Sequence, residues 1–257
     1  MRSIVITGVS RGLGAALFDE FYAAGDRILA LGRRFTAAQH QAERGEPHRI
    51  RLRHTDLAHP AALPGAAEMG SFVHDATEVV LIHNAGVLEP VGAIGALAPD
   101  QIQYAMTVNV TSPMVLTNAL FGTGVIGPAT AIGTPAASVS GTAARLTVLF
   151  ISSGAAHTML GGWSVYSAAK RAGETFFEAL AAQHADDPRI RVVNVQPGII
   201  DTDMQATVRQ YAGRQVYFPD GPRFVAAYER GQLPRASEVA RKIIDQYLSA
   251  PIMNYGS

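Results

Sequence analysis

Short apolar runs alternate with longer amphipathic segments along this chain, and that alternation restricts its fold more than any other feature. The apolar runs predict six strands, at residues 3–7, 27–31, 49–54, 79–83, 147–152 and 191–196. Helical patterns lie between and after them, at residues 13–24, 99–120, 164–184 and 237–249. Strands that alternate with helices form βαβ units, whose right-handed crossovers place helices on both faces of a parallel sheet. We therefore expect an α/β chain with one doubly wound sheet and no linker that would divide it.

Composition narrows the classes of function. Lys and Arg together number 21, as do Asp and Glu, so charge predicts neither a nucleic-acid partner nor a membrane-surface partner. The chain has no cysteine, which excludes disulfides, thiolate metal sites and cysteine nucleophiles, and no metal site is predicted. The first apolar run is too short for a signal peptide, and no run is long enough to cross a bilayer. We expect a cytoplasmic protein.

A glycine-rich turn joins the first predicted strand to the first predicted helix. It reads Thr-Gly-Val-Ser-Arg-Gly-Leu-Gly over residues 7–14. Glycines let the backbone turn tightly and approach a pyrophosphate, whose charge the helix N-terminus stabilises. The alternative is an ordinary tight turn between a strand and a helix. The dinucleotide hypothesis assigns cofactor contacts to Gly8, Ser10, Arg11, Gly12, Leu13 and Gly14.

The second predicted strand leads into a basic pair, Gly32-Arg33-Arg34. Proteins that bind the non-phosphorylated dinucleotide usually place an acidic residue here, which bonds the ribose hydroxyls. Arginine side chains instead offer planar, doubly hydrogen-bonding groups for a 2′-phosphate, and Arg11 can close the other side. The alternative is a solvated basic pair without a ligand. The pattern favours NADP(H) as the cofactor.

A tyrosine, a lysine and a serine form the candidate catalytic centre. Tyr166 and Lys170 are four residues apart in a predicted helix and therefore share a face, while Ser153 follows the fifth predicted strand. Reduction of a carbonyl needs a proton for the forming alkoxide, which Tyr166 can donate, and Ser153 can hydrogen-bond the same oxygen. A free tyrosine has a pKa near ~10. We expect the Lys170 ammonium and an oxidised nicotinamide together to lower that pKa.

Taken in order, the glycine-rich turn, Asn84-Ala85-Gly86, Ser153 and the Tyr166/Lys170 pair resemble the short-chain dehydrogenase/reductase family. Its sepiapterin reductase and benzil reductase branch is similar to this chain at residues 162–166, 197–205 and 228–233. The resemblance implies a single-domain Rossmann fold over residues 1–257, with a mostly parallel sheet of about seven strands and helices on both faces. It implies an NADPH-dependent carbonyl reductase that uses Tyr166 as proton donor on a dicarbonyl. The alternatives are an oxidative alcohol, sugar or steroid dehydrogenase of the same family and a non-catalytic NADP(H)-sensing module.

The resemblance also implies roles for residues that spacing alone does not single out. Asn109 matches the family's fourth catalytic member, which holds a water behind the lysine. Asp56 matches a residue that bonds the adenine, although an Asp before Pro60 is equally explained as a helix cap. The remaining cofactor contacts implied by the resemblance are Leu57, Asn84, Ala85, Gly86, Tyr166, Lys170, Pro197, Gly198, Ile199 and Thr202.

Specificity is expected to come from residues 202–235, the usual position of the substrate lid. This segment carries five aromatic residues, which either contact an aromatic substrate or form the lid's own core: Tyr211, Tyr217, Phe218, Phe224 and Tyr228. Trp163 and Met159 are further candidates for the pocket. Sepiapterin reductases grip the pterin with a carboxylate near the C-terminus. No acidic residue follows Asp245 here, so a diketone fits better than a pterin.

Two further segments bear on assembly. Residues 122–144 are rich in Gly, Ala, Thr, Pro and Ser and carry no charged side chain. They form either a surface or subunit-contact insertion or a lid over the site. Residues 251–257 are short for a final strand, which argues against the family's tetramer interface. We expect a homodimer through the helices that begin near Pro99 and Ser164.

Overall fold

The strands form one parallel sheet in the order β3-β2-β1-β4-β5-β6. The structure is a computed structural model that describes residues 1–125, 144–158, 160–214 and 216–248. This is the strand order of a doubly wound nucleotide-binding sheet, so the predicted fold class is confirmed. The described residues contain six strands rather than about seven, and residues 251–257 lie outside them. The strands are β1 Arg2–Thr7, β2 Arg27–Gly32, β3 Ile50–His54, β4 Glu78–His83, β5 Arg145–Ile151 and β6 Ile190–Val195.

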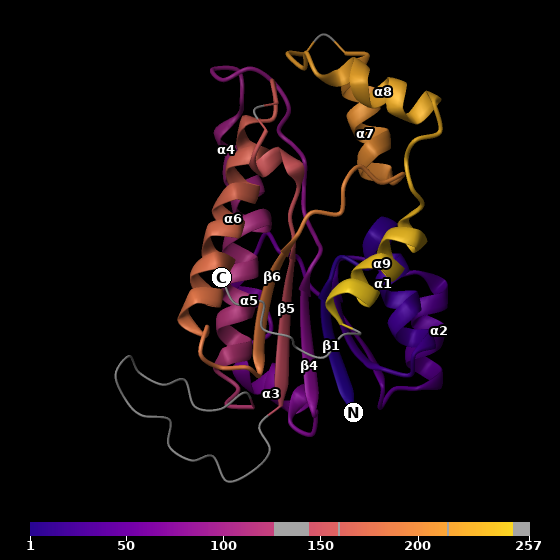
Figure 1. Ribbon diagram of the computed structural model, residues 1–257, viewed down its shortest axis with the longest axis vertical. Helices are drawn as coiled ribbons and strands as arrows, with labels where there is room; N and C mark the ends of the chain where they lie inside the picture. The colour runs from indigo at the N-terminus through magenta and orange to yellow at the C-terminus, as the bar shows by residue number, and fades with distance from the viewer. Residues whose placement is uncertain (126–143, 159, 215, 249–257) are drawn as a thin grey trace.

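Helices cover both faces of the sheet (Figure 1). The helices α1, α2 and α9 pack on one face, and α3, α5 and α6 pack on the other. The α-helices are α1 Gly12–Ala23, α2 Ala37–Gly45, α3 Ala66–Val73, α4 Pro99–Met106, α5 Ser112–Phe121, α6 Ser164–Gln183, α7 Asp203–Ala212, α8 Gly221–Glu229 and α9 Ala236–Tyr247. Shorter turns are the 3₁₀ segments η1 Pro60–Ala62 and η3 Gly154–Ala156 and the π segment η2 Thr107–Thr111. Within the described ranges, no helix is both long and apolar enough to span a membrane.

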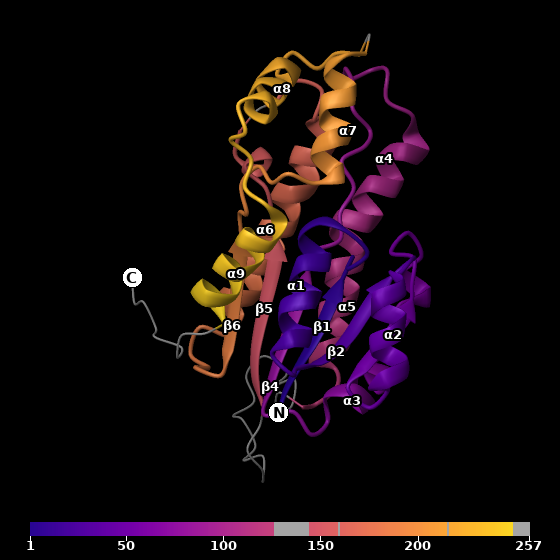
Figure 2. The same cartoon turned by 90° about the vertical axis from the view of Figure 1, so that its right-hand side faces the viewer.

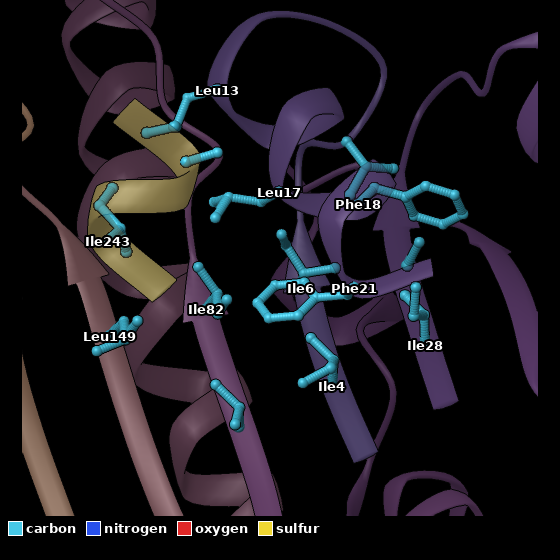
Figure 3. Close-up of a cluster of buried hydrophobic side chains, with 14 of the residues drawn as sticks. Ile4, Ile6, Leu13, Leu17, Phe18, Phe21, Ile28, Ile82, Leu149 and Ile243 are labelled. Carbon is cyan, nitrogen blue, oxygen red and sulfur yellow. The ribbon is translucent and has the colours of Figure 1, made fainter. Parts of the chain in front are cut away.

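Alternation along each strand divides the core into two layers. Ile4 and Ile6 of β1 belong to the cluster beneath α1 and α9, whereas Val5 between them belongs to the cluster on the opposite face. Figure 3 shows the first cluster, where Leu17 and Phe21 of α1 lie over the strands. Because both faces are covered, the central strands β1, β4 and β5 are largely buried, and their ends remain available to a ligand.

The predicted lid begins and ends at one point of the fold. The Asp201 backbone N–H donates to the Pro234 carbonyl at 3.1 Å, and Asp201 forms an isolated parallel bridge with Arg235. Between these positions, α7 and α8 stand beyond the carboxyl ends of the strands (Figure 2). The lid is therefore a helical excursion over the edge where parallel sheets bind ligands.

The uncharged insertion begins and ends at the opposite edge of the sheet. The Ala144 N–H donates to the Val125 carbonyl at 3.4 Å, one residue before β5 begins. Residues 126–143, which make up most of the predicted insertion, lie outside the described residues.

Candidate active site

A cavity of about 800 Å³ opens at the carboxyl edge of the sheet, beneath the lid. Its walls come from the ends of β1, β2, β4, β5 and β6, from the start of α6 and from α7. All the predicted catalytic and cofactor-binding residues belong to the described part of the chain, and every one except Asn109 lines this cavity. Segments far apart in the sequence thus meet at one site.

The glycine-rich turn leaves no room for a side chain at Gly8 or Gly14. Gly8 has a φ of +76°, and a Cβ on it would lie 2.9 Å from the Ala85 Cα. A Cβ on Gly14 would overlap the Gly8 carbonyl oxygen and the Asn84 amide nitrogen. Helix α1 begins at Gly12, and Arg11 at its N-cap makes no side-chain capping bond within the described helix. The first-turn N–H groups therefore remain available to an anion, and the turn fits a pyrophosphate.

Asn84 holds this turn against the neighbouring strand. Its Nδ2 donates to the carbonyls of Thr7 at 3.1 Å and Gly8 at 2.9 Å. The Thr7 hydroxyl accepts from the N–H groups of Asn84 at 3.1 Å and Ala85 at 3.0 Å. The predicted Asn-Ala-Gly element lines the cavity, and its hydrogen bonds show how it acts: it fixes the ends of β1 and β4 to each other.

The predicted 2′-phosphate residues lie together at the rim. Arg33 and Arg34 are exposed, and the Arg33 Nη1 lies 3.3 Å from the Tyr104 hydroxyl oxygen, to which it donates. Arg11 is also exposed, and its Nη1 pairs with the Asp203 carboxylate of α7 at 3.2 Å. The rim is thus rich in positive charge, although Arg11 already has a carboxylate partner on the lid.

Asp56 forms a local turn rather than a helix cap. Its Oδ1 accepts a hydrogen bond from the Ala58 N–H at 3.0 Å. The following 3₁₀ segment has His59, not Asp56, at its N-cap, so the capping alternative is wrong. Asp56 and Leu57 both line the cavity, as the adenine hypothesis requires.

Tyr166, Lys170 and Ser153 converge as the spacing predicts. Tyr166 and Lys170 project from the first turns of α6 and are buried, and the Tyr166 hydroxyl is hydrogen-bonded to the Ser153 side chain. The Ser153 Oγ also accepts from the Ala155 N–H at 3.2 Å, which fixes the serine at the start of η3. The Lys170 Nζ donates to the Ile151 carbonyl at 2.8 Å and lies 5.8 Å from the centre of the Tyr166 ring.

Burial controls the charge states of this centre. Desolvation raises the pKa of Tyr166, and the hydrogen bond with Ser153 opposes that rise. The predicted lowering of this pKa, by Lys170 together with an oxidised nicotinamide, concerns the cofactor-bound protein and stays a prediction. Burial lowers the pKa of Lys170 to about 8, and the charge of Glu174 opposes that change. Tyr166 is consequently protonated at neutral pH, as a proton donor must be.

Asn109 stands behind the cavity. It lies in the π segment η2, where its Oδ1 accepts from the Val87 N–H at 2.9 Å and its Nδ2 donates to the Val87 carbonyl at 2.8 Å. A Cβ on Gly86 would lie 3.0 Å from the Asn109 Oδ1 and 3.4 Å from the Lys170 Nζ. Asn109 thus holds the chain beside Lys170, and its part in a water relay stays a prediction.

The segment after β6 closes the far side of the cavity. Pro197, Gly198, Ile199 and Thr202 all line it, and a Cβ on Gly12 would lie 3.2 Å from the Thr202 Cγ2. Thr202 is the N-cap residue of α7, with no side-chain capping bond in the described helix. The glycine-rich turn and the start of the lid are therefore direct neighbours.

Aromatic side chains enclose the end of the cavity next to Tyr166. Trp163 stacks on Phe218 and Phe224, with ring centroids 5.3 Å and 5.2 Å apart, and meets Tyr166 edge-on at 5.7 Å. Trp163 and Phe224 line the cavity, as predicted, and Leu88 and Leu160 add apolar surface. This end of the cavity suits an apolar or aromatic substrate.

Most of the lid aromatics serve the lid itself. All five lie in the described part of the chain, and Phe224 alone among them lines the cavity. Phe218 is buried behind Trp163, and the Tyr211 hydroxyl donates to the Glu89 carboxylate at 2.8 Å. Tyr217 and Tyr228 are exposed. Phe218 thus belongs to the lid's own core, Phe224 belongs to that core and also lines the cavity, and the exposed Tyr217 and Tyr228 fit neither interpretation. Met159 lies outside the described residues.

Several cavity residues were missed by the sequence reasoning. Val87 and Leu88 directly follow Asn84-Ala85-Gly86, and their position after a strand end could have identified them. Tyr104 and Leu160 carry no local signal, because only the packing of α4 and of the segment before α6 brings them to the cavity. Gln205 was read as part of a motif but not as a lining residue.

Comparisons with known proteins agree with this geometry. A family model described as short chain dehydrogenase matches residues 2–213. The benzil reductase ((S)-benzoin forming) of Bacillus subtilis is 27% identical over 245 residues, which cover 95% of this chain and 92% of that protein. The sepiapterin reductase of Xenopus tropicalis is 29% identical over 255 residues, covering 94% and 89%. The crystal structure of the KRED1-Pglu enzyme superposes with a TM-score of 0.74 and 28% identity, covering 96% and 95%.

Proposed function

The chain belongs to the short-chain dehydrogenase family, and from that premise we propose that it is an NADPH-dependent carbonyl reductase acting on dicarbonyl substrates. The observation that carries the proposal is the convergence of Tyr166, Lys170 and Ser153 in the cavity that the glycine-rich turn also lines. A buried, protonated phenol beside a serine hydroxyl is suited to donate a proton to a ketone oxygen.

The chain's own residues account for the binding and proton-transfer parts of the reaction. When bound, the nicotinamide supplies the hydride that reduces the carbonyl carbon. The turn at residues 8–14 would hold the pyrophosphate, and Lys170 would hold the nicotinamide ribose. Tyr166 gives its phenolic proton to the carbonyl oxygen, and the Ser153 hydroxyl donates a hydrogen bond to the same atom.

The arginine pair supports NADPH over NADH. Arg33 and Arg34 follow β2 at the cavity rim, where no carboxylate is present in the Gly32-Arg33-Arg34 sequence to bond a ribose diol. Two guanidinium groups can bind a 2′-phosphate by charge-assisted hydrogen bonds.

Replacing Arg33 and Arg34 together by Ala should raise the KM for NADPH about 10- to 100-fold, from the loss of one or more charge-assisted hydrogen bonds. The KM for NADH should change little, because NADH has no 2′-phosphate. Steady-state kinetics with both cofactors measures the two effects. Arg44→Ala, at the end of α2 outside the cavity, is the matched control. Equal effects on the two cofactors would refute the phosphate-binding role.

The shape of the cavity and the relatives together support a dicarbonyl substrate. Trp163, Phe224, Leu88 and Leu160 provide apolar walls beside Tyr166. Two proteins similar to this chain are a Bacillus subtilis enzyme named as a benzil reductase and a sepiapterin reductase from Xenopus tropicalis. Benzil is a 1,2-diketone, in which each carbonyl activates the other, and the first of these names therefore supports a dicarbonyl substrate.

An NADPH-oxidation screen across aryl diketones, aliphatic diketones, a pterin, quinones and simple ketones tests the substrate class. We expect the highest kcat/KM with aryl 1,2-diketones, because they combine an activated carbonyl with apolar surface. A preference for simple aliphatic ketones, or oxidation of alcohols without reduction of any diketone, would contradict the proposal.

A further inference from the structure

A buried carboxylate lies behind the proposed active site, outside the set of described residues that line the cavity. Glu174 is on α6, one turn after Lys170, and its side chain is only 2% exposed. A carboxylate removed from water is costly unless hydrogen bonds and opposite charges stabilise it. The side chains that contact the Glu174 carboxylate therefore indicate its role.

Three side chains meet the Glu174 carboxylate. The His157 Nε2 lies 2.7 Å from Oε2, and the Arg171 Nη1 lies 3.5 Å from the same oxygen. The Gln196 Nε2 donates to Oε1 at 3.3 Å. Both carboxylate oxygens are thus engaged, and the Glu174 backbone carbonyl also accepts from the Asn194 Nδ2 at 3.2 Å.

Each contact reaches a different segment of the active site. His157 follows η3, the turn that Ser153 begins. Glu174 itself extends the face of α6 that carries Tyr166 and Lys170, because residues four apart share a face. Gln196 directly precedes Pro197 and Gly198, which line the cavity.

We propose that Glu174 is a positioning residue whose single carboxylate joins the Ser153 turn, the catalytic helix and the strand end that leads to Pro197. This inference rests on the proposed reductase function. Ser153 and Tyr166 must act on the same substrate oxygen, so a shift of the turn relative to the helix directly changes their separation. Misplacement by about 1 Å can cost about 100-fold in rate.

The same carboxylate has an electrostatic effect on Lys170. Burial lowers the pKa of Lys170 to about 8, and the charge of Glu174 works against that change. The other titratable or charged groups facing this pair are His157 after η3, Arg171 on α6, and His83 of β4, whose pKa burial lowers to about 3. Arg171 also lies 3.8 Å from the carboxylate of Glu178. Loss of the Glu174 charge should therefore let Lys170 lose its proton at a lower pH.

The test compares Glu174→Gln with Glu178→Gln in the full-length protein. Both changes remove one carboxylate near Arg171, but Glu178 is 54% exposed and does not touch His157 or Gln196 among its described contacts. For Glu174→Gln we expect kcat for diketone reduction to fall about 10-fold or more. The alkaline limb of the kcat/KM pH profile should move to lower pH, and the NADPH Kd should change less than kcat. Glu178→Gln should match the wild type in all three.

A second pair of variants changes His157, which follows η3. This pair remains informative if thermal unfolding shows that Glu174→Gln is strongly destabilised. His157 is 48% exposed on its side chain, so substitutions there spare the core. His157→Ala should lower kcat, and His157→Gln, which keeps a donor near the position of Nε2, should restore most of it. An unchanged kcat in His157→Ala, or the same kcat and alkaline limb in Glu174→Gln and Glu178→Gln, would overturn the positioning role. A wild-type protein that reduces no carbonyl compound would instead refute the proposed function, and this inference with it.

Discussion

Tyr166→Phe is expected to lower kcat for diketone reduction by about 10²- to 10⁴-fold, the range for loss of a positioned general acid. The substitution removes one oxygen from a buried side chain and leaves its ring against Trp163. Of Tyr166, Lys170 and Ser153, the phenol is the group proposed to give up its proton, and burial raises its pKa. Single-turnover kinetics with NADPH, followed by loss of nicotinamide absorbance, measures the effect.

NADPH binding should survive this change, because the glycine-rich turn and the arginine pair are untouched. Fluorescence titration of NADPH provides that measurement. Tyr217→Phe is the matched control, since its hydroxyl belongs to a lid residue that is 58% exposed and does not line the cavity in the described structure. Turnover by Tyr166→Phe at the rate of Tyr217→Phe would exclude Tyr166 as the proton donor.

Gly14→Ala is expected to cost about 1–3 kcal/mol of unfolding free energy, as overpacking does, and to abolish tight NADPH binding. The added Cβ would overlap the Gly8 carbonyl and the Asn84 amide, so the turn that receives the pyrophosphate must move. Denaturant unfolding and NADPH titration report the two losses separately.

A second glycine supplies the control for that variant. Gly45 also lies in a helix, but a Cβ there would meet no atom within 4 Å. Gly45→Ala should therefore be neutral, or stabilising by up to about 1 kcal/mol, and should leave NADPH binding intact. If Gly14→Ala bound NADPH as tightly as Gly45→Ala, the close packing of the turn would have no role in cofactor binding.

The strands and the main catalytic residues could be predicted because their signals are local. A run of apolar residues marks a strand buried on both faces, and each predicted strand overlaps an observed one with ends that differ by at most two residues. The four-residue spacing of Tyr166 and Lys170 needs only a helix to bring them together. Ser153 needed one further inference, that strand ends meet at one edge of a parallel sheet.

The helix predicted over residues 99–120 shows where local patterns stop being sufficient. The structure is helical from Pro99 to Phe121, but the π segment Thr107–Thr111 interrupts it and carries Asn109. Periodicity does not reveal a single wide turn of this kind, because the neighbouring turns keep the helical repeat. The spacing could not show that the Asn109 amide would bond Val87.

Long-range packing accounts for the other differences. The sequence could not show that desolvation would raise the pKa of Tyr166, because that burial depends on how Trp163 and other distant segments pack around the phenol. Nor could it pair His157 with Glu174, since their contact depends on how η3 folds over α6. Lid aromatics such as Phe218 look the same in sequence whether they contact a ligand or one another.

The bridge between Asp201 and Arg235 marks the boundary between the lid and the rest of the chain. Since the excursion that carries α7 and α8 leaves and returns at neighbouring backbone positions, its length and sequence can vary without displacing the strands on either side. The proposed proton-transfer residues lie at a strand end and on α6, whereas the excursion contributes cavity-lining residues such as Met204, Val208 and Phe224. Grafting a lid from a relative between these two anchor points is therefore a direct route to altered selectivity with the proton-transfer apparatus left in place.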